Sequence, residues 1–72
     1  MEAKYKIGEI VKVYEYYADE IIKDAYYGLI VNATAHRFEG GCHFIYHILP
    51  NDETRPKKIQ TAEEFALERV EI

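Results

Sequence analysis

Residues 39–50 read EGGCHFIYHILP, a turn signal followed by an alternating strand pattern. Glycine supplies the positive φ that tight hairpin turns require, so Glu39-Gly40-Gly41 predicts a turn. Successive side chains of a strand point to opposite faces. The strand from Cys42 to Leu49 therefore places Phe44, Tyr46 and Ile48 on one face and His43, Ile45, His47 and Leu49 on the other. Pro50-Asn51-Asp52 ends it with turn-forming residues.

Two further strands are predicted before this turn. The first runs from Lys6 to Tyr16, begins at a Gly8-Glu9 turn and is rich in β-branched and aromatic residues. The second runs from about Tyr26 to Ala35. In it, Gly28 leads into an apolar run that suits a strand covered on both faces.

The segment 14–25, between these two strands, allows two interpretations. Its apolar residues recur at helical spacing, at Tyr14, Tyr17, Ile21, Ile22 and Ala25, which would suit an amphipathic helix. Glu15-Tyr16-Tyr17 has strand-like composition instead. We favour a long hairpin-like loop, and the helix stays open as the alternative.

The last third of the chain predicts two short strands around a helical turn. Residues 56–60 form a short strand, and Thr61-Ala62-Glu63-Glu64 has the pattern of a capping box that starts a single turn of helix. Residues 66–72 alternate apolar and charged side chains, as a closing strand does. The predicted core consists of Val11, Val13, Ile30, Phe44, Tyr46, Ile48, Phe65, Leu67 and Val70.

This order of elements resembles that of SH3-like barrels over nearly the whole chain. Gly8-Glu9-Ile10-Val11-Lys12-Val13 is similar to the Gly-Asp-x-Val-x-Val opening of many such domains, with Glu9 where aspartate is usual. A second point of resemblance to these barrels is the strand that begins Gly28-Leu29-Ile30-Val31. Residues 64–70 resemble the tail of the photosystem I SH3-type subunit, of the ferredoxin–thioredoxin reductase variable chain and, more loosely, of the nitrile hydratase β subunit.

The resemblance implies a mainly all-β fold, a five-stranded SH3-like barrel with one short 3-10 or helical turn before the last strand. Residues 1–72 then form a single domain. The proteins it resembles are accessory or docking domains, and short barrels of this pattern also look common among bacteriophage accessory proteins. We therefore expect a non-catalytic adaptor, an accessory subunit or a phage-encoded modulator.

Composition agrees with a small folded domain. The chain has 72 residues, of which 49% are hydrophobic and 31% charged, a balance typical of globular proteins. Cys42 is the only cysteine, so no internal disulfide forms, and we expect a reducing, cytoplasmic location. No run approaches the roughly 18 apolar residues of a membrane span, and the first residues lack the apolar run of a signal peptide.

The net charge of −4 opposes simple nucleic-acid binding, because that affinity comes mainly from lysine and arginine. We expect a protein partner of unknown identity and leave a homo-oligomer open. One alternative function is an acidic inhibitor that mimics nucleic acid, through Asp19, Glu20 and Asp24 and through Glu63, Glu64, Glu68 and Glu71. A second is weak nucleic-acid binding through a basic turn, at Arg55, Lys57 and Lys58.

The histidines and the cysteine predict neither a metal site nor catalysis. His43 and His47 share a strand face but lie about 13 Å apart at roughly 3.3 Å per residue, too far to bind one ion. His36 could approach one of them across a hairpin. Cys42 lacks a recognisable orienting group or oxyanion hole, so an inert thiol is expected. We expect no catalytic residues, no cofactor and no enzyme.

Tyrosine content is the strongest functional signal. The chain has seven tyrosines and no tryptophan, and tyrosine is enriched at protein interfaces because it offers a rigid apolar ring with a polar end. We predict a partner-binding set of Tyr14, Tyr16, Tyr17, Asp19, Glu20, Tyr26 and Tyr27. Of these, Tyr16, Tyr17 and Tyr27 are expected to be exposed. The alternative is that these rings complete a small core.

Overall fold

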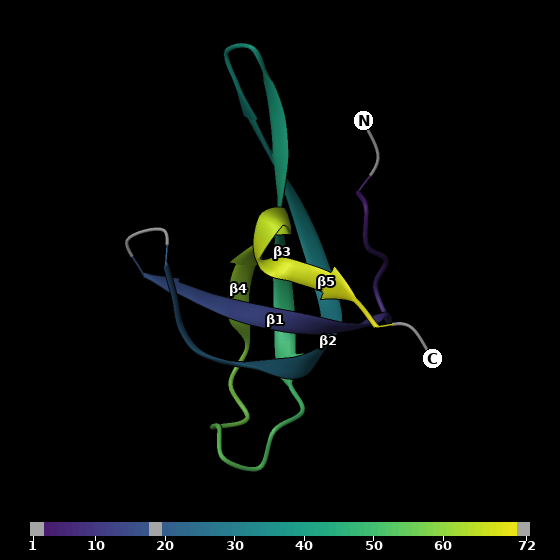
Figure 1. Cartoon of the computed structure of the whole chain (residues 1–72). Helices are drawn as coiled ribbons and strands as arrows, with labels where there is room; N and C mark the ends of the chain where they lie inside the picture. The colour runs from purple at the N-terminus through teal and green to yellow at the C-terminus, as the bar shows by residue number, and fades with distance from the viewer. Residues whose placement is uncertain (1–2, 18–19, 71–72) are drawn as a thin grey trace.

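The computed structural model describes residues 3–17 and 20–70, with the side chains of residues 16, 17 and 20–24 outside the description. Five antiparallel strands form one sheet in the order β4-β3-β2-β1-β5 (Figure 1). The elements are β1 (Ile10–Tyr17), β2 (Glu20–Phe38), β3 (Gly41–Pro50), β4 (Gln60–Glu63), the 3-10 turn η1 (Glu64–Ala66) and β5 (Leu67–Arg69). The predicted five-stranded, mainly all-β fold with one 3-10 turn before the last strand is confirmed.

The β1–β2 hairpin replaces the loop expected over residues 14–25. β1 continues to Tyr17 and pairs through Tyr17 with Glu20, so the amphipathic-helix alternative is wrong and the loop is much shorter than expected. Cross-strand pairing gives these backbone groups partners that a long loop would leave to water. Two register shifts between Val13 and Tyr16 let the hairpin bend without ending its strands.

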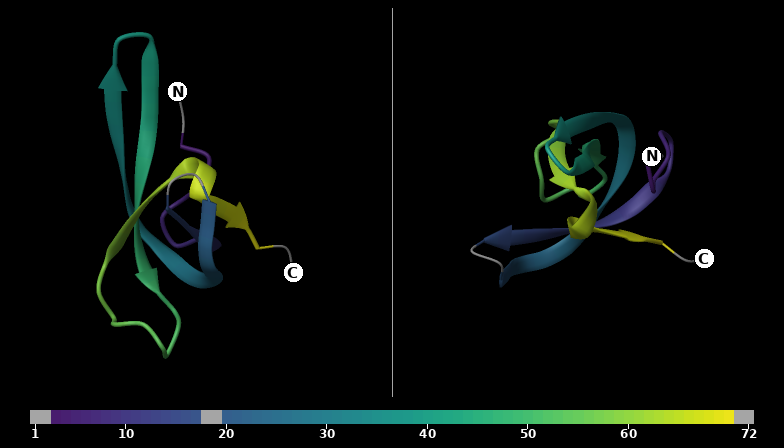
Figure 2. Two further views of the ribbon diagram at one scale, coloured as in Figure 1. Left: turned by 60° about the vertical axis from the view of Figure 1, so that its left-hand side comes forward. Right: turned by 90° about the horizontal axis from the view of Figure 1, so that it is seen from above.

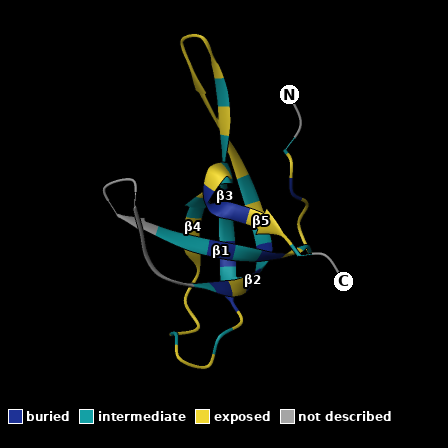
Figure 3. Cartoon of the chain, in the orientation of Figure 1, coloured by how far each residue is buried: buried dark blue, intermediate teal, exposed yellow. Residues whose placement is uncertain are grey.

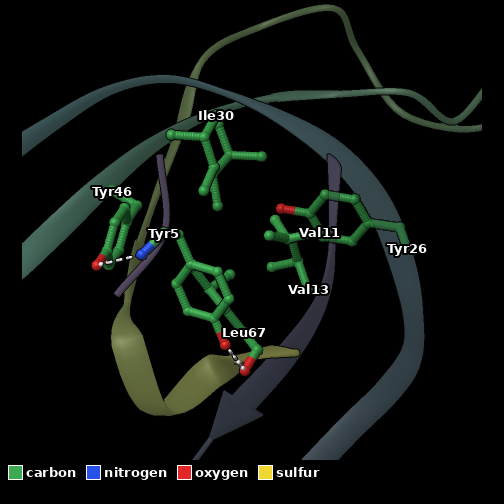
Figure 4. Close-up of a cluster of buried hydrophobic side chains, with 8 residues drawn as sticks. Tyr5, Val11, Val13, Tyr26, Ile30, Tyr46 and Leu67 are labelled. Carbon is green, nitrogen blue, oxygen red and sulfur yellow. Dashed lines mark hydrogen bonds between the residues drawn. The ribbon is translucent and has the colours of Figure 1, made fainter. Parts of the chain in front are cut away.

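The sheet bends so that β1 and β5 cross over β3 (Figures 1 and 2). β2 makes this bend: its first part pairs with β1, and from Gly28 onward it also pairs with β3. Gly28 is one reason the strands approach closely here, because a Cβ at this position would overlap Ile48 Cγ2. The core lies inside the bend and comprises Tyr5, Val11, Val13, Tyr26, Ile30, Tyr46, Ile48 and Leu67 (Figure 4).

The predicted core is correct in its centre and wrong at one end. Six predicted residues are buried, namely Val11, Val13, Ile30, Tyr46, Ile48 and Leu67. Phe44 is only partly buried and packs against this cluster, and Val70 is half-buried and does not belong to the cluster. Phe65 was placed in the core wrongly, because it is 68% exposed. Figure 3 shows that the turn before β5 carries both exposed and buried residues. The 3-10 turn breaks the strand alternation, so that Ala66 points inward in place of Phe65.

Tyr5 is a core residue that the sequence pattern did not indicate, since it lies between two lysines. Its backbone N–H donates to the Tyr46 hydroxyl at 3.3 Å, and its own hydroxyl donates to the Leu67 carbonyl at 3.0 Å (Figure 4). The rings of Tyr5 and Tyr46 meet edge to face at 5.5 Å. Burial raises the pKa of Tyr46. The two hydrogen bonds of Tyr5 hold the N-terminal segment against β3 and β5.

The turns follow prediction, but the capping box does not form. Gly8 and Gly40 have φ values of 93° and 99°, the left-handed region that favours glycine. Thr61 lies within β4 and pairs with His47, and η1 has no side-chain cap, so the capping-box prediction is wrong. β4 begins at Gln60, where the predicted short strand was to end. Strand pairing with β3 outweighs the local helix-start signal.

Candidate functional site

An open groove of about 450 Å³ lies between the β1–β2 hairpin on one side and β4 with η1 on the other. Its lining combines apolar and polar side chains, from Val13, Tyr14, Glu15, Tyr26, Gln60, Thr61, Ala62, Glu63, Phe65 and Ala66. Val13 and Tyr26 are buried, and Phe65 is exposed. Core residues therefore form the floor of the groove, and an exposed aromatic ring lies at its rim.

One wall of the groove is the outer edge of β4. β4 pairs with β3 and is the last strand on its side of the sheet. An edge strand presents backbone N–H and C=O groups that an extended peptide can pair with. Gln60 and Thr61 are exposed along this edge. The groove can therefore offer main-chain hydrogen bonds as well as side-chain contacts.

Tyr14 lies at the opposite wall, on β1. Its hydroxyl donates to Glu68 Oε2 at 3.1 Å, and Lys12 Nζ lies 5.5 Å from the centre of its ring. These contacts fix the ring while leaving it partly exposed. Two carboxylates line the groove: Glu63 favours a basic group on a ligand, whereas Glu15 is already paired with Arg55.

Arg55 reaches from the β3–β4 loop to the hairpin, where it contacts two residues that line the groove. Its Nη1 donates to Glu15 Oε1, and its guanidinium carbon lies 4.0 Å from the centre of the Tyr26 ring. Its Nε is 3.4 Å from Asp52 Oδ2. The side chain is only 22% exposed. Arg55 is therefore held by contacts within the chain.

Asp52 orients the loop that carries Arg55. The Thr54 backbone N–H donates to Asp52 Oδ1 at 2.9 Å, and the Thr54 hydroxyl donates to the same oxygen at 2.7 Å. These two bonds, with a smaller contribution from Arg55, lower the pKa of the Asp52 carboxyl. The loop is thereby set at an angle that lets Arg55 reach Glu15.

Replacing Arg55 with alanine is expected to lower the free energy of unfolding by about 1.5–3 kcal/mol, because Glu15 loses a charge-assisted hydrogen bond and Tyr26 loses the cation above its ring. Urea denaturation measures this. Arg55→Lys keeps the charge but loses the planar contact, so it should recover only part of the loss. An Arg55→Ala protein as stable as the wild type would contradict this account of the loop.

One of the three cations of the predicted basic turn is already paired within the chain. Arg55 contacts Glu15 and Tyr26, while Lys57 and Lys58 are exposed. A phosphate would therefore meet two lysines instead of three cations. This arrangement weakens the case for nucleic-acid binding through residues 55–58.

The predicted tyrosines do not share one surface, because consecutive side chains of β2 point to opposite faces of the sheet. Tyr26 points inward to the groove floor and Tyr14 lines its wall, whereas Tyr27 is 48% exposed and lies beside Lys12 and Glu68 in a separate depression. Asp19 lies outside the described residues, as do the side chains of Tyr16, Tyr17 and Glu20.

Sequence reasoning missed the part of the groove that β4 and η1 supply. Gln60 and Thr61 were assigned to a strand end and a helix cap, and Phe65 was assigned to the core. The exposure of Phe65 could have been predicted from its place in the helical turn. A helical turn interrupts the alternation of inward and outward side chains that a strand has.

The histidines and Cys42 all lie on the β2–β3 hairpin, with His36, Cys42 and His43 near its turn and His47 beside Thr61 of β4. His36 and His43 are cross-strand neighbours with stacked rings 5.6 Å apart, and the His47 Nε2 lies 3.1 Å from the Thr34 hydroxyl. Over residues 3–17 and 20–70, no three histidine, cysteine, aspartate or glutamate side chains are grouped to hold a metal ion. Cys42 is partly buried.

Comparison with protein-family models, with curated proteins and with solved structures finds no match. Within the described part of the chain, no helix has the length and apolar character needed to cross a membrane.

Proposed function

We propose that this protein is a non-catalytic docking module of SH3-like architecture that binds an extended segment of a partner protein in the groove between the β1–β2 hairpin and β4. The observation that supports this most strongly is the joining of three elements in one groove: an apolar floor, an exposed aromatic rim at Phe65 and an edge strand. Such a site suits an adaptor, an accessory subunit or a phage-encoded modulator.

The lining specifies the chemistry of the partner segment. Tyr26, Ala62 and Ala66 provide an apolar surface, and the β4 edge provides backbone pairing. Glu63 adds negative charge. A segment that carries apolar side chains and a basic residue complements all three features. Tyr27, which lies outside the groove, extends the proposal to a second part of the surface.

The test compares a groove variant with a matched surface variant. Phe65→Ala, combined with Thr61→Arg to place a cation on the β4 edge, should lose at least about tenfold in affinity, equal to about 1.4 kcal/mol. Ile7→Ala is the control, since Ile7 is 65% exposed and does not line the groove. Partners are captured from cells that make the protein, and the affinity is measured by calorimetry.

Two outcomes would overturn the proposal. The first is a folded groove variant that retains every partner at unchanged affinity. The second is a steep loss of affinity with salt together with competition by nucleic acid. Apolar burial and backbone pairing are weakly screened, whereas mimicry of phosphate charge depends on long-range attraction. A response to salt that is nearly flat supports docking and excludes the acidic-mimic alternative.

A further inference from the structure

The outer part of the β2–β3 hairpin projects beyond the rest of the sheet as a two-stranded ribbon (Figures 1 and 2). All residues from 34 to 41 are exposed. The ladder on the β1 side of β2 ends at Ile30, which accepts a hydrogen bond from Gly8 N–H and donates one to the Glu9 carbonyl. Beyond that point, within the described chain, residues 34–38 pair only with β3.

This ribbon has the properties of a strand edge that another strand can extend. A two-stranded hairpin without further packing is marginally stable in water, and an unpaired edge is a template for strand addition. Edges that resist pairing commonly carry lysine, proline or a bulge. Residues 34–38 read TAHRF, with a single charge at Arg37, and their pairing with β3 is regular.

We propose that residues 34–38 of β2 pair antiparallel with the same residues of a second copy of the chain, which forms a two-fold dimer. A two-fold axis that pairs all five residues must pass beside His36. Thr34 then lies opposite Phe38 of the second copy, a pair of β-branched and aromatic residues that stabilises antiparallel strands. Ala35 lies opposite Arg37 of the second copy. The sequence of the edge is thus complementary to itself.

Charge favours a second copy at this place. Each chain carries a net charge of −4, which opposes association elsewhere, but residues 34–41 contain one arginine and one glutamate and are neutral. In the two-fold arrangement Arg37 faces an alanine, so no like charges oppose one another. Five paired residues bury far less than a standard protein interface, so the dimer is weak and its population depends on protein concentration. This edge lies apart from the groove, and the dimer is independent of the proposed function.

The first test changes the residue beside the axis. Molar mass is measured by sedimentation equilibrium over a hundredfold range of concentration, where the wild type should rise from 8.5 kDa toward twice that value. His36→Lys places two lysines opposite each other and should raise the dissociation constant about fivefold or more. His36→Thr, neutral and strand-forming, should dimerise like the wild type. A wild type that stays monomeric, or a dimer unaffected by His36→Lys, overturns the proposal.

The second test fixes the geometry by cross-linking. Opposed residues of an antiparallel pair have Cα atoms about 4.5–5.5 Å apart, within the range of a disulfide. His36→Cys in a Cys42→Ser background should therefore oxidise to a covalent dimer. The control is Lys58→Cys in the same background, an exposed thiol on the β3–β4 loop. Equal cross-linking of the two variants would reject the two-fold axis at His36.

Discussion

Replacing Tyr46 with alanine is expected to lower the free energy of unfolding by about 3–5 kcal/mol, the range for removing a large buried aromatic ring. Tyr46 is fully buried at the centre of the core, where it contacts Tyr5 edge to face. Its hydroxyl also accepts a hydrogen bond from Tyr5 N–H. Small domains are stable by about 5–15 kcal/mol, so this one change should remove a large share of the stability of the domain. Urea denaturation followed by circular dichroism measures the loss.

Two controls separate the ring from its hydroxyl. Tyr46→Phe keeps the ring and removes the acceptor for Tyr5 N–H, so it should cost about 1 kcal/mol. Phe65→Ala removes a ring of similar size that is 68% exposed, so it should change stability by no more than about 0.5 kcal/mol. If Phe65→Ala lost as much stability as Tyr46→Ala, the core would not be centred on Tyr46.

Replacing Gly28 with alanine is expected to cost about 1–3 kcal/mol, through a collision and not through backbone conformation. A Cβ at position 28 would lie 3.3 Å from the Leu49 carbonyl oxygen and in severe overlap with Ile48 Cγ2. That methyl group is attached to a β-branched carbon of a fully buried residue, so it cannot swing away as the end of a long side chain could. Thermal and urea unfolding of the variant check the prediction.

The collision at Gly28 has a specific rescue. Ile48→Leu removes the branch at Cβ at nearly constant volume and should cost less than about 1.5 kcal/mol by itself. In that background, Gly28→Ala should cost clearly less than it does in the wild type, because the colliding methyl group is gone. Gly40→Ala is the contrasting variant: nothing lies within 4 Å of its Cβ, and its cost comes from a positive φ. An unchanged cost at Gly28 in the Ile48→Leu background would reject the steric explanation.

The candidate site was only partly predictable from the sequence. Tyr14 and Tyr26 were identified from composition, and they do line one groove. The contribution of β4 and η1 was not predicted, because Thr61 to Glu64 carries a genuine helix-start signal that strand pairing with β3 overrides. Arg55 was assigned to a basic surface because composition shows its charge but not its partners. Glu15 lies 40 residues earlier in the chain, and the loop at Asp52 brings them together.

The sequence by itself determined the position of β3, the start of β1 and the middle of β2, and the faces that these parts present. Alternation from Cys42 to Leu49, the glycines at positions 8 and 40 and the β-branched run of β1 are local signals, and local sterics act without knowledge of the rest of the chain. Tertiary structure decided whether residues 14–25 became a loop, a helix or a hairpin, because that choice depends on the backbone hydrogen bonds and burial that a facing strand offers. It also decided that Tyr5 is buried and Phe65 exposed. Burial is a property of what packs against a residue, and the elements that pack against these two are distant in the sequence.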